Sequence, residues 1–190
     1  CTKIPSDTNH ALATMFGCAI TTAFGVVENN ANLKIGESVV VYGAGGIGLN
    51  IIQASSLKSA YPIIAVDLFE NRLSLASKMG ATHTINASNK DINVKKEIKN
   101  ILKNYQLDCF IDNTGIPAII ELGYQIVSPC GRVILVGVPA IGNNINIYSL
   151  QLHFGKQLLG SHGGESIPEI DIKRYLSCLL YTSPSPRDSS

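Results

Sequence analysis

The chain has 190 residues, of which 45% are hydrophobic and 15% charged, and its formal net charge is +1. A chain of this length buries one substantial core, and a net charge near zero argues against a nucleic-acid or membrane surface as the main partner. No apolar run reaches the length of a bilayer-spanning helix, and no signal peptide is visible. The five cysteines are scattered without a C-x-x-C pair, which fits a reducing compartment, so we expect a cytoplasmic protein.

Apolar strand-like runs and helical patterns alternate along the chain. The expected helices are, in order, a short one that Ser6 or Asp7 could cap and that runs to Phe16, then Ala19–Asn29, Leu49–Lys58, Glu70–Met79, Ile92–Lys103, Pro117–Ile126 and Asp171–Ser177. The expected strands are Val39–Val41, Pro62–Val66, Thr82–Ile85, Asp108–Ile111, Arg132–Val136 and Gln157–Gly160. Strands too apolar to face water, separated by helices, predict an α/β fold with a Rossmann-type, doubly wound parallel sheet in a single domain.

Two features concern the ends of the sequence. It starts with Cys1 rather than Met, within what reads as running sequence, so we expect further residues upstream. At its other end the helical pattern changes abruptly into CLLYTSPSPRD, which looks like the in-frame translation of a sequencing adapter. The alternative is a natural Ser/Pro-rich tail. We therefore expect a domain over residues 1–177 and a disordered, adapter-derived tail over 178–190.

A G-x-G-x-x-G motif follows the first expected strand. Gly43 allows a tight turn, Gly45 lets the backbone approach a pyrophosphate, and Gly48 permits close packing of helix on strand. The start of the helix after the motif offers unpaired N–H groups and a dipole that favour phosphate, and Gly46 and Ile47 within the motif are further candidate cofactor-binding residues. A flexible turn without a ligand is the simpler alternative, but a strand before and a helix after the motif favour a dinucleotide site.

Further candidate binding residues stand at the ends of the other strands. Asp67 ends the second strand, about 20 residues beyond the last glycine, where an acid accepts the adenosine ribose hydroxyls and repels a 2′-phosphate. Thr114-Gly115 and Gly137-Val138 follow the fourth and fifth strands. Because ligands of such sheets bind beyond the carboxyl ends of the strands, these loops are expected to converge on one crevice.

The order GCAITT, KIGESVVVYGAGGIG, IIAVD, LASKMGAT and RVILVGVP resembles the nucleotide-binding half of the zinc-dependent medium-chain alcohol dehydrogenases, over roughly Lys3 to Ser177. In that family a catalytic N-terminal domain precedes this half, and it is missing here. The resemblance implies that Cys18 is a ligand of the catalytic zinc and that Thr22 lies beside nicotinamide and substrate, although Ala23 replaces the usual glycine. It also implies that Arg72 reaches the ribose or a phosphate, and that Val136-Gly137-Val138 holds the nicotinamide amide.

The resemblance implies an NAD-linked, zinc-dependent dehydrogenase that transfers hydride from a small hydroxyl substrate, an alcohol or polyol, to NAD, and a homo-oligomer in the full-length protein. Because one thiolate cannot hold zinc in the required geometry, we expect this chain by itself to bind NAD weakly without turnover. Three alternatives stay open: a zinc-free quinone or enoyl reductase of the same superfamily, a non-catalytic nucleotide-binding module, and a methyltransferase. A short-chain dehydrogenase is disfavoured, since none of the seven tyrosines has Lys four residues on.

Overall fold

The computed structural model describes residues 3–4, 8, 10–89 and 91–182; Cys1 and the expected helix cap at Ser6 or Asp7 lie outside that part. The described strands form one sheet in the order β3-β2-β1-β4-β5-β6, and every neighbouring pair is parallel. In chain order the strands are β1 Val39–Tyr42, β2 Ile63–Asp67, β3 His83–Asn86, β4 Cys109–Asp112, β5 Arg132–Leu135 and β6 Gln157–Gly160. This order is that of a doubly wound dinucleotide-binding sheet, so the expected fold class is confirmed.

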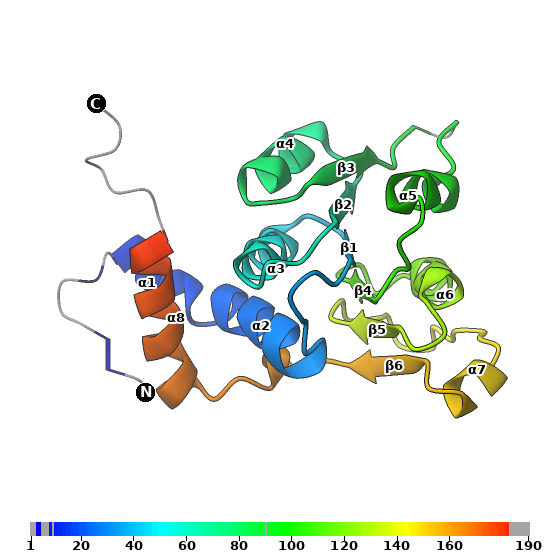
Figure 1. Ribbon diagram of the computed structural model, residues 1–190. Helices are drawn as coiled ribbons and strands as arrows, with labels where there is room; N and C mark the ends of the chain where they lie inside the picture. Colours follow the sequence, from blue (N-terminus) through cyan, green and yellow to red (C-terminus); the bar gives the residue numbers. More distant parts are fainter. Residues whose placement is uncertain (1–2, 5–7, 9, 90, 183–190) are drawn as a thin grey trace.

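Helices cover both faces of this sheet. In chain order they are α1 His10–Met15, α2 Ala19–Gly25, the π-helical turn η1 Val26–Asn30, α3 Gly46–Leu57, α4 Glu70–Lys78, α5 Val94–Leu102, α6 Pro117–Ile126, α7 Leu150–His153, the 3₁₀ turn η2 Gly163–Glu165 and α8 Pro168–Thr182. In Figure 1, α2, α3 and α4 lie on one side of the sheet and α5 and α6 on the other. Among the described helices, none is long and apolar enough to cross a membrane.

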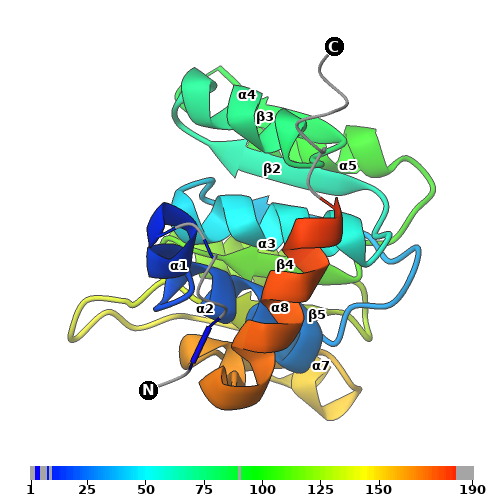
Figure 2. The ribbon, with the colours of Figure 1, turned by 90° about the vertical axis from the view of Figure 1, so that its left-hand side faces the viewer.

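The alternation of side chains along β1 explains the two layers. Val39 and Val41 point into the core beneath α3, whereas Val40 points into a second core formed with α5 and α6. All three are fully buried, which is why the β-branched run suits a central parallel strand. On the side of the sheet covered by α2, α3 and α4, α8 packs on α2 (Figure 2), where the rings of Phe24 and Tyr175 lie 5.0 Å apart.

Several expected boundaries are wrong. The helix after the first strand begins at Gly46 rather than Leu49, because the chain turns completely within Gly43–Gly45. The helix expected over Ala19–Asn29 ends at Gly25 and continues as a π-helical turn.

One further boundary is corrected near the C-terminus. The helix expected over 171–177 spans Pro168–Thr182, so it continues into the segment assigned to a tail. Residues 183–190 lie outside the described part, and their adapter origin stays a prediction. Cys130 is exposed in the turn before β5.

Candidate functional site

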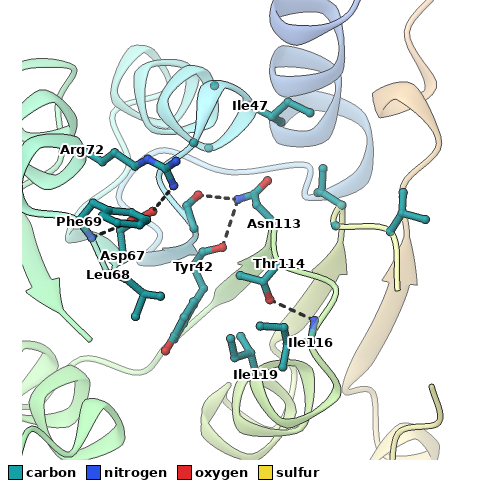
Figure 3. A pocket seen from close by; sticks show the side chains of 17 residues that line it. Tyr42, Ile47, Asp67, Leu68, Phe69, Arg72, Asn113, Thr114, Ile116 and Ile119 are labelled. Atoms are coloured by element: carbon teal, nitrogen blue, oxygen red, sulfur yellow. Dashed lines mark hydrogen bonds and ion pairs between the residues drawn. The ribbon is translucent and has the colours of Figure 1, made fainter. Parts of the chain in front are cut away.

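A crevice of about 600 Å³ opens at the carboxyl ends of β1, β2, β4 and β5 (Figure 3). It lies at the switch point of the sheet, where β1 pairs with β2 on one side and with β4 on the other. The residues that line it are Tyr42, Gly43, Gly45, Gly46, Ile47, Gly48, Asp67, Leu68, Phe69, Arg72, Asn113, Thr114, Ile116, Ile119, Val136, Gly137 and Val138. The four loops expected to converge therefore do so.

The glycine turn shapes the middle of the crevice. Gly43 has φ +94°, which L side chains rarely adopt, and a Cβ on Gly48 would lie 1.9 Å from the Gly43 carbonyl oxygen. Gly43 thus makes the turn, and Gly48 lets α3 lie against the end of β1. A Cβ on Gly45 or Gly46, by contrast, would meet nothing within 4 Å. Protein packing does not require glycine at these two positions; a side chain there would instead occupy the crevice, so the turn suits a ligand that approaches the backbone.

Asp67 lies between the glycine turn and the loop after β2, and only 5% of its surface is exposed. Its Oδ2 accepts the Ala44 N–H at 2.7 Å, and its Oδ1 accepts the Phe69 N–H at 3.0 Å. Arg72 Nη1 lies 3.6 Å from Oδ2, and its guanidinium lies 4.7 Å from the centre of the Phe69 ring. Each carboxylate oxygen keeps further acceptor capacity, so Asp67 can still accept ribose hydroxyls.

The loops after β4 and β5 meet backbone to backbone. Asp112, fully buried, accepts hydrogen bonds from the Thr114 N–H at 3.0 Å, the Thr114 hydroxyl at 2.6 Å and the Gly115 N–H at 2.9 Å. A Cβ on Gly137 would lie 2.3 Å from the Gly115 nitrogen, and a Cβ on Gly115 2.7 Å from the Val138 carbonyl oxygen. Gly115, expected to bind the cofactor, is not among the lining residues and instead supports the loop that carries Thr114.

The apolar wall of the crevice and one polar side chain in it were not predicted from the sequence. These residues are Tyr42, Leu68, Phe69, Asn113, Ile116 and Ile119. Burial raises the pKa of Tyr42, and the charges of Asp112 and Asp67 raise it further, so the hydroxyl stays protonated. The missed residues end or directly follow β1, β2 and β4, or lie at the start of α6, and that position was the signal that could have identified them.

Cys18 and Thr22 do not line the crevice. Cys18 is exposed and directly precedes α2, whereas Thr22 is buried within that helix. The described residues contain no group of three or more His, Cys, Asp or Glu side chains that could hold a metal ion. Since a catalytic zinc takes three protein ligands, the described part of the chain does not form a zinc site by itself.

The chain matches known proteins along most of its length. A family model described as zinc-binding dehydrogenase matches residues 46–179. Among curated proteins, the S-(hydroxymethyl)glutathione dehydrogenases of Synechocystis sp. and Escherichia coli are 30% and 32% identical to it over 165 residues. Each match covers 85% of this chain but 44% of the relative, so the chain spans less than half the length of these relatives.

Two solved structures share the fold. An alcohol dehydrogenase zinc-binding domain protein from Burkholderia ambifaria has a TM-score of 0.87, and benzyl alcohol dehydrogenase from Acinetobacter calcoaceticus has one of 0.86. Both are 31% identical to this chain and cover 98% of it, and the match spans 50% and 51% of their own chains. The family model covers well over half of the sequence, from the first residue of α3 through Asp67 and the β5 loop. The chain therefore belongs to the zinc-binding dehydrogenase family.

Proposed function

We propose that this chain is the NAD-binding part of an NAD-linked alcohol or polyol dehydrogenase. The observation that carries the proposal is the crevice at the switch point, where the open backbone of Gly45 and Gly46 lies next to the carboxylate of Asp67. Gly45 and Gly46 offer N–H groups to a diphosphate, and Asp67 offers hydrogen-bond acceptors to a ribose. The family relatives are named as dehydrogenases of hydroxyl compounds, which supports a small hydroxyl substrate.

The order of strands supports a direction for the dinucleotide. Bound NAD would place its adenosine ribose at the end of β2 with Asp67 and Arg72, and its diphosphate over the turn after β1. Its nicotinamide half would lie over the loops after β4 and β5, where Thr114 and Val136–Val138 line the crevice. Bound NAD would supply the hydride acceptor, while these residues orient it and exclude water from one side.

Cys18 is proposed as one zinc ligand of the full-length protein. Its exposure is consistent with a ligand that residues outside this chain complete. Because the described residues supply no complete ligand set, zinc would also need ligands from outside this part of the chain. Thr22 is proposed to face the nicotinamide and the substrate.

Two further proposals concern the full-length protein. β6 is an edge strand, and Leu159 on it is 38% exposed, which favours a homo-oligomer formed along this edge. Cys18, Cys109 and Cys130 are free thiols, which supports a cytoplasmic location.

Isothermal titration of the 190-residue chain with NAD and NADP tests the proposal. We expect NAD to bind and NADP to bind more weakly, because a 2′-phosphate would meet the Asp67 carboxylate. Equal affinities would contradict the role of Asp67. Binding of S-adenosylmethionine in place of NAD would contradict the proposed function and favour a methyltransferase.

A further inference from the structure

Asn113 directly follows β4 and lies against the glycine turn in the middle of the crevice (Figure 3). Its side-chain Nδ2 donates to the carbonyl oxygen of Gly43 at 3.3 Å and lies 3.5 Å from that of Tyr42. Its backbone N–H donates to the same Tyr42 oxygen at 2.9 Å. One residue of the β4 loop therefore holds the point at which β1 ends and the turn begins.

The Gly43–Ala44 peptide is held at both of its polar ends. Its carbonyl oxygen accepts the Asn113 Nδ2 hydrogen bond, and its N–H donates to Asp67 Oδ2 at 2.7 Å. A flip of this planar group would turn the carbonyl oxygen toward the Asp67 carboxylate and the N–H toward the Asn113 amide nitrogen. Both hydrogen bonds would be lost. The carbonyl oxygen would then face the negative Asp67 carboxylate, and the N–H would face the N–H groups of the Asn113 amide. The two side chains thus select one orientation of the peptide.

The orientation of the Asn113 amide follows from its neighbours. With Nδ2 exchanged for Oδ1, an acceptor would face two carbonyl oxygens, so the donor must point toward the turn. In the described part of the protein, the buried Oδ1 has no hydrogen-bond partner. An unpaired buried oxygen is unfavourable, so what Asn113 contributes here comes from its donor.

The hydrogen bonds from Asn113 and Asp67 matter because a glycine by itself does not fix the orientation of its peptide. Gly43 has φ +94°, and a glycine adopts positive and negative φ about equally well. The orientation of its peptide determines the direction of the following amides at Gly45 and Gly46, which begin α3. We propose that Asn113 is a positioning residue, which together with Asp67 holds the Gly43–Ala44 peptide so that these amides face the diphosphate of the dinucleotide. The inference rests on the proposed function and adds to it a role for a residue that needs no contact with the ligand.

The test compares Asn113→Leu, which keeps the approximate shape without the donor, with the shorter Asn113→Ser. Asn100→Leu, at an exposed position of α5, is the matched control. Isothermal titration of the 190-residue chain measures affinity for NAD and for ADP, which shares the diphosphate but lacks the second nucleoside. Hydrogen exchange of the Ala44 and Gly45 amides is followed in the unliganded proteins by NMR.

We expect both Asn113 variants to bind NAD and ADP about threefold to tenfold more weakly, by the same factor for each ligand, as for the loss of one hydrogen bond. The Ala44 and Gly45 amides should exchange faster than in the wild type, while Asn100→Leu changes neither property. Unchanged affinities in both Asn113 variants would overturn the inference. A loss confined to NAD would also overturn it, because Asn113 would then contact the second nucleoside rather than position the turn. A wild-type chain that binds neither ligand would overturn the proposed function and this inference with it.

Discussion

The Gly48→Ala substitution has two opposite effects on stability, a gain in helix propensity and a loss of packing where α3 contacts β1. Inside an exposed helix, replacing glycine by alanine stabilises by about 1 kcal/mol. At Gly48, however, the new Cβ would lie 1.9 Å from the Gly43 oxygen and 3.0 Å from its carbonyl carbon. Since carbon–oxygen contacts rarely fall below about 3.3 Å, the helix start would have to move by roughly 1.4 Å. The obstacle is backbone, so no side-chain rotation relieves it.

Overpacking of this kind costs about 1–3 kcal/mol, and the overlap here is severe. After the gain in helix propensity, we expect a net loss of about 2 kcal/mol in the free energy of unfolding. Urea unfolding followed by far-UV circular dichroism measures it. A Gly48→Ala variant as stable as the wild type, or more stable, would refute the packing argument.

Gly46→Ala is the matched control, since it makes the same change two residues earlier in α3. There the Cβ would meet nothing within 4 Å, so the free energy of unfolding should not fall. Because the Cβ would instead project into the crevice, we expect NAD affinity to fall in the same titration. A destabilised Gly46→Ala, or one that binds NAD as well as the wild type, would contradict the assignment of this position to the ligand.

Three other predictions concern single side chains. Burial would raise the pKa of Glu37, but hydrogen bonds from Arg132 and from the Lys34 N–H outweigh it and lower that pKa. The stabilising contribution is therefore present above the ordinary pKa of about 4.3 and is lost as the pH falls through the lowered value. Glu37→Gln should lower the free energy of unfolding by about 1–3 kcal/mol at neutral pH. In urea unfolding, this difference from the wild type should become smaller as the pH is lowered; a difference that stays constant would contradict the prediction. Asp67→Asn keeps an acceptor oxygen but removes the charge, so the ratio of NAD to NADP affinity should fall severalfold; an unchanged ratio would count against electrostatic selection. Cys18→Ser should leave NAD affinity unchanged, and neither the wild-type chain nor this variant should oxidise alcohols by itself. Alcohol oxidation by the isolated chain would contradict the inference that the zinc site needs ligands from outside it.

The local elements could be predicted because their causes lie within a few residues. The Val39–Val41 run makes a doubly buried strand, and Gly80 and Pro117 mark a helix end and a helix start. Helix boundaries near glycine were less predictable. α3 begins inside the motif, at Gly46, because the positive φ of Gly43 completes the turn sooner than the sequence pattern indicates.

Contacts between distant segments could not be predicted. Asn113 acts on Gly43, 70 residues earlier in the chain, and does so only because β4 pairs with β1 rather than with β3. The sequence shows that an asparagine follows a strand, but not which strand lies beside it. Tyr42, Ile116 and Ile119 could have been identified as strand-end or helix-start residues, but only the order of the strands brings them together in one apolar wall.

The sequence by itself determined the alternation of strands and helices, the glycine turn and the acid that ends β2, because backbone conformation and burial pattern are set by neighbouring residues. The tertiary structure decided which loops share the crevice, that Asp67 and Asn113 hold opposite ends of one peptide, and that Cys18 lies outside the crevice lining. These properties depend on the order of strands in the sheet. That order is set by how the whole chain packs its two cores, and no short stretch of residues encodes it.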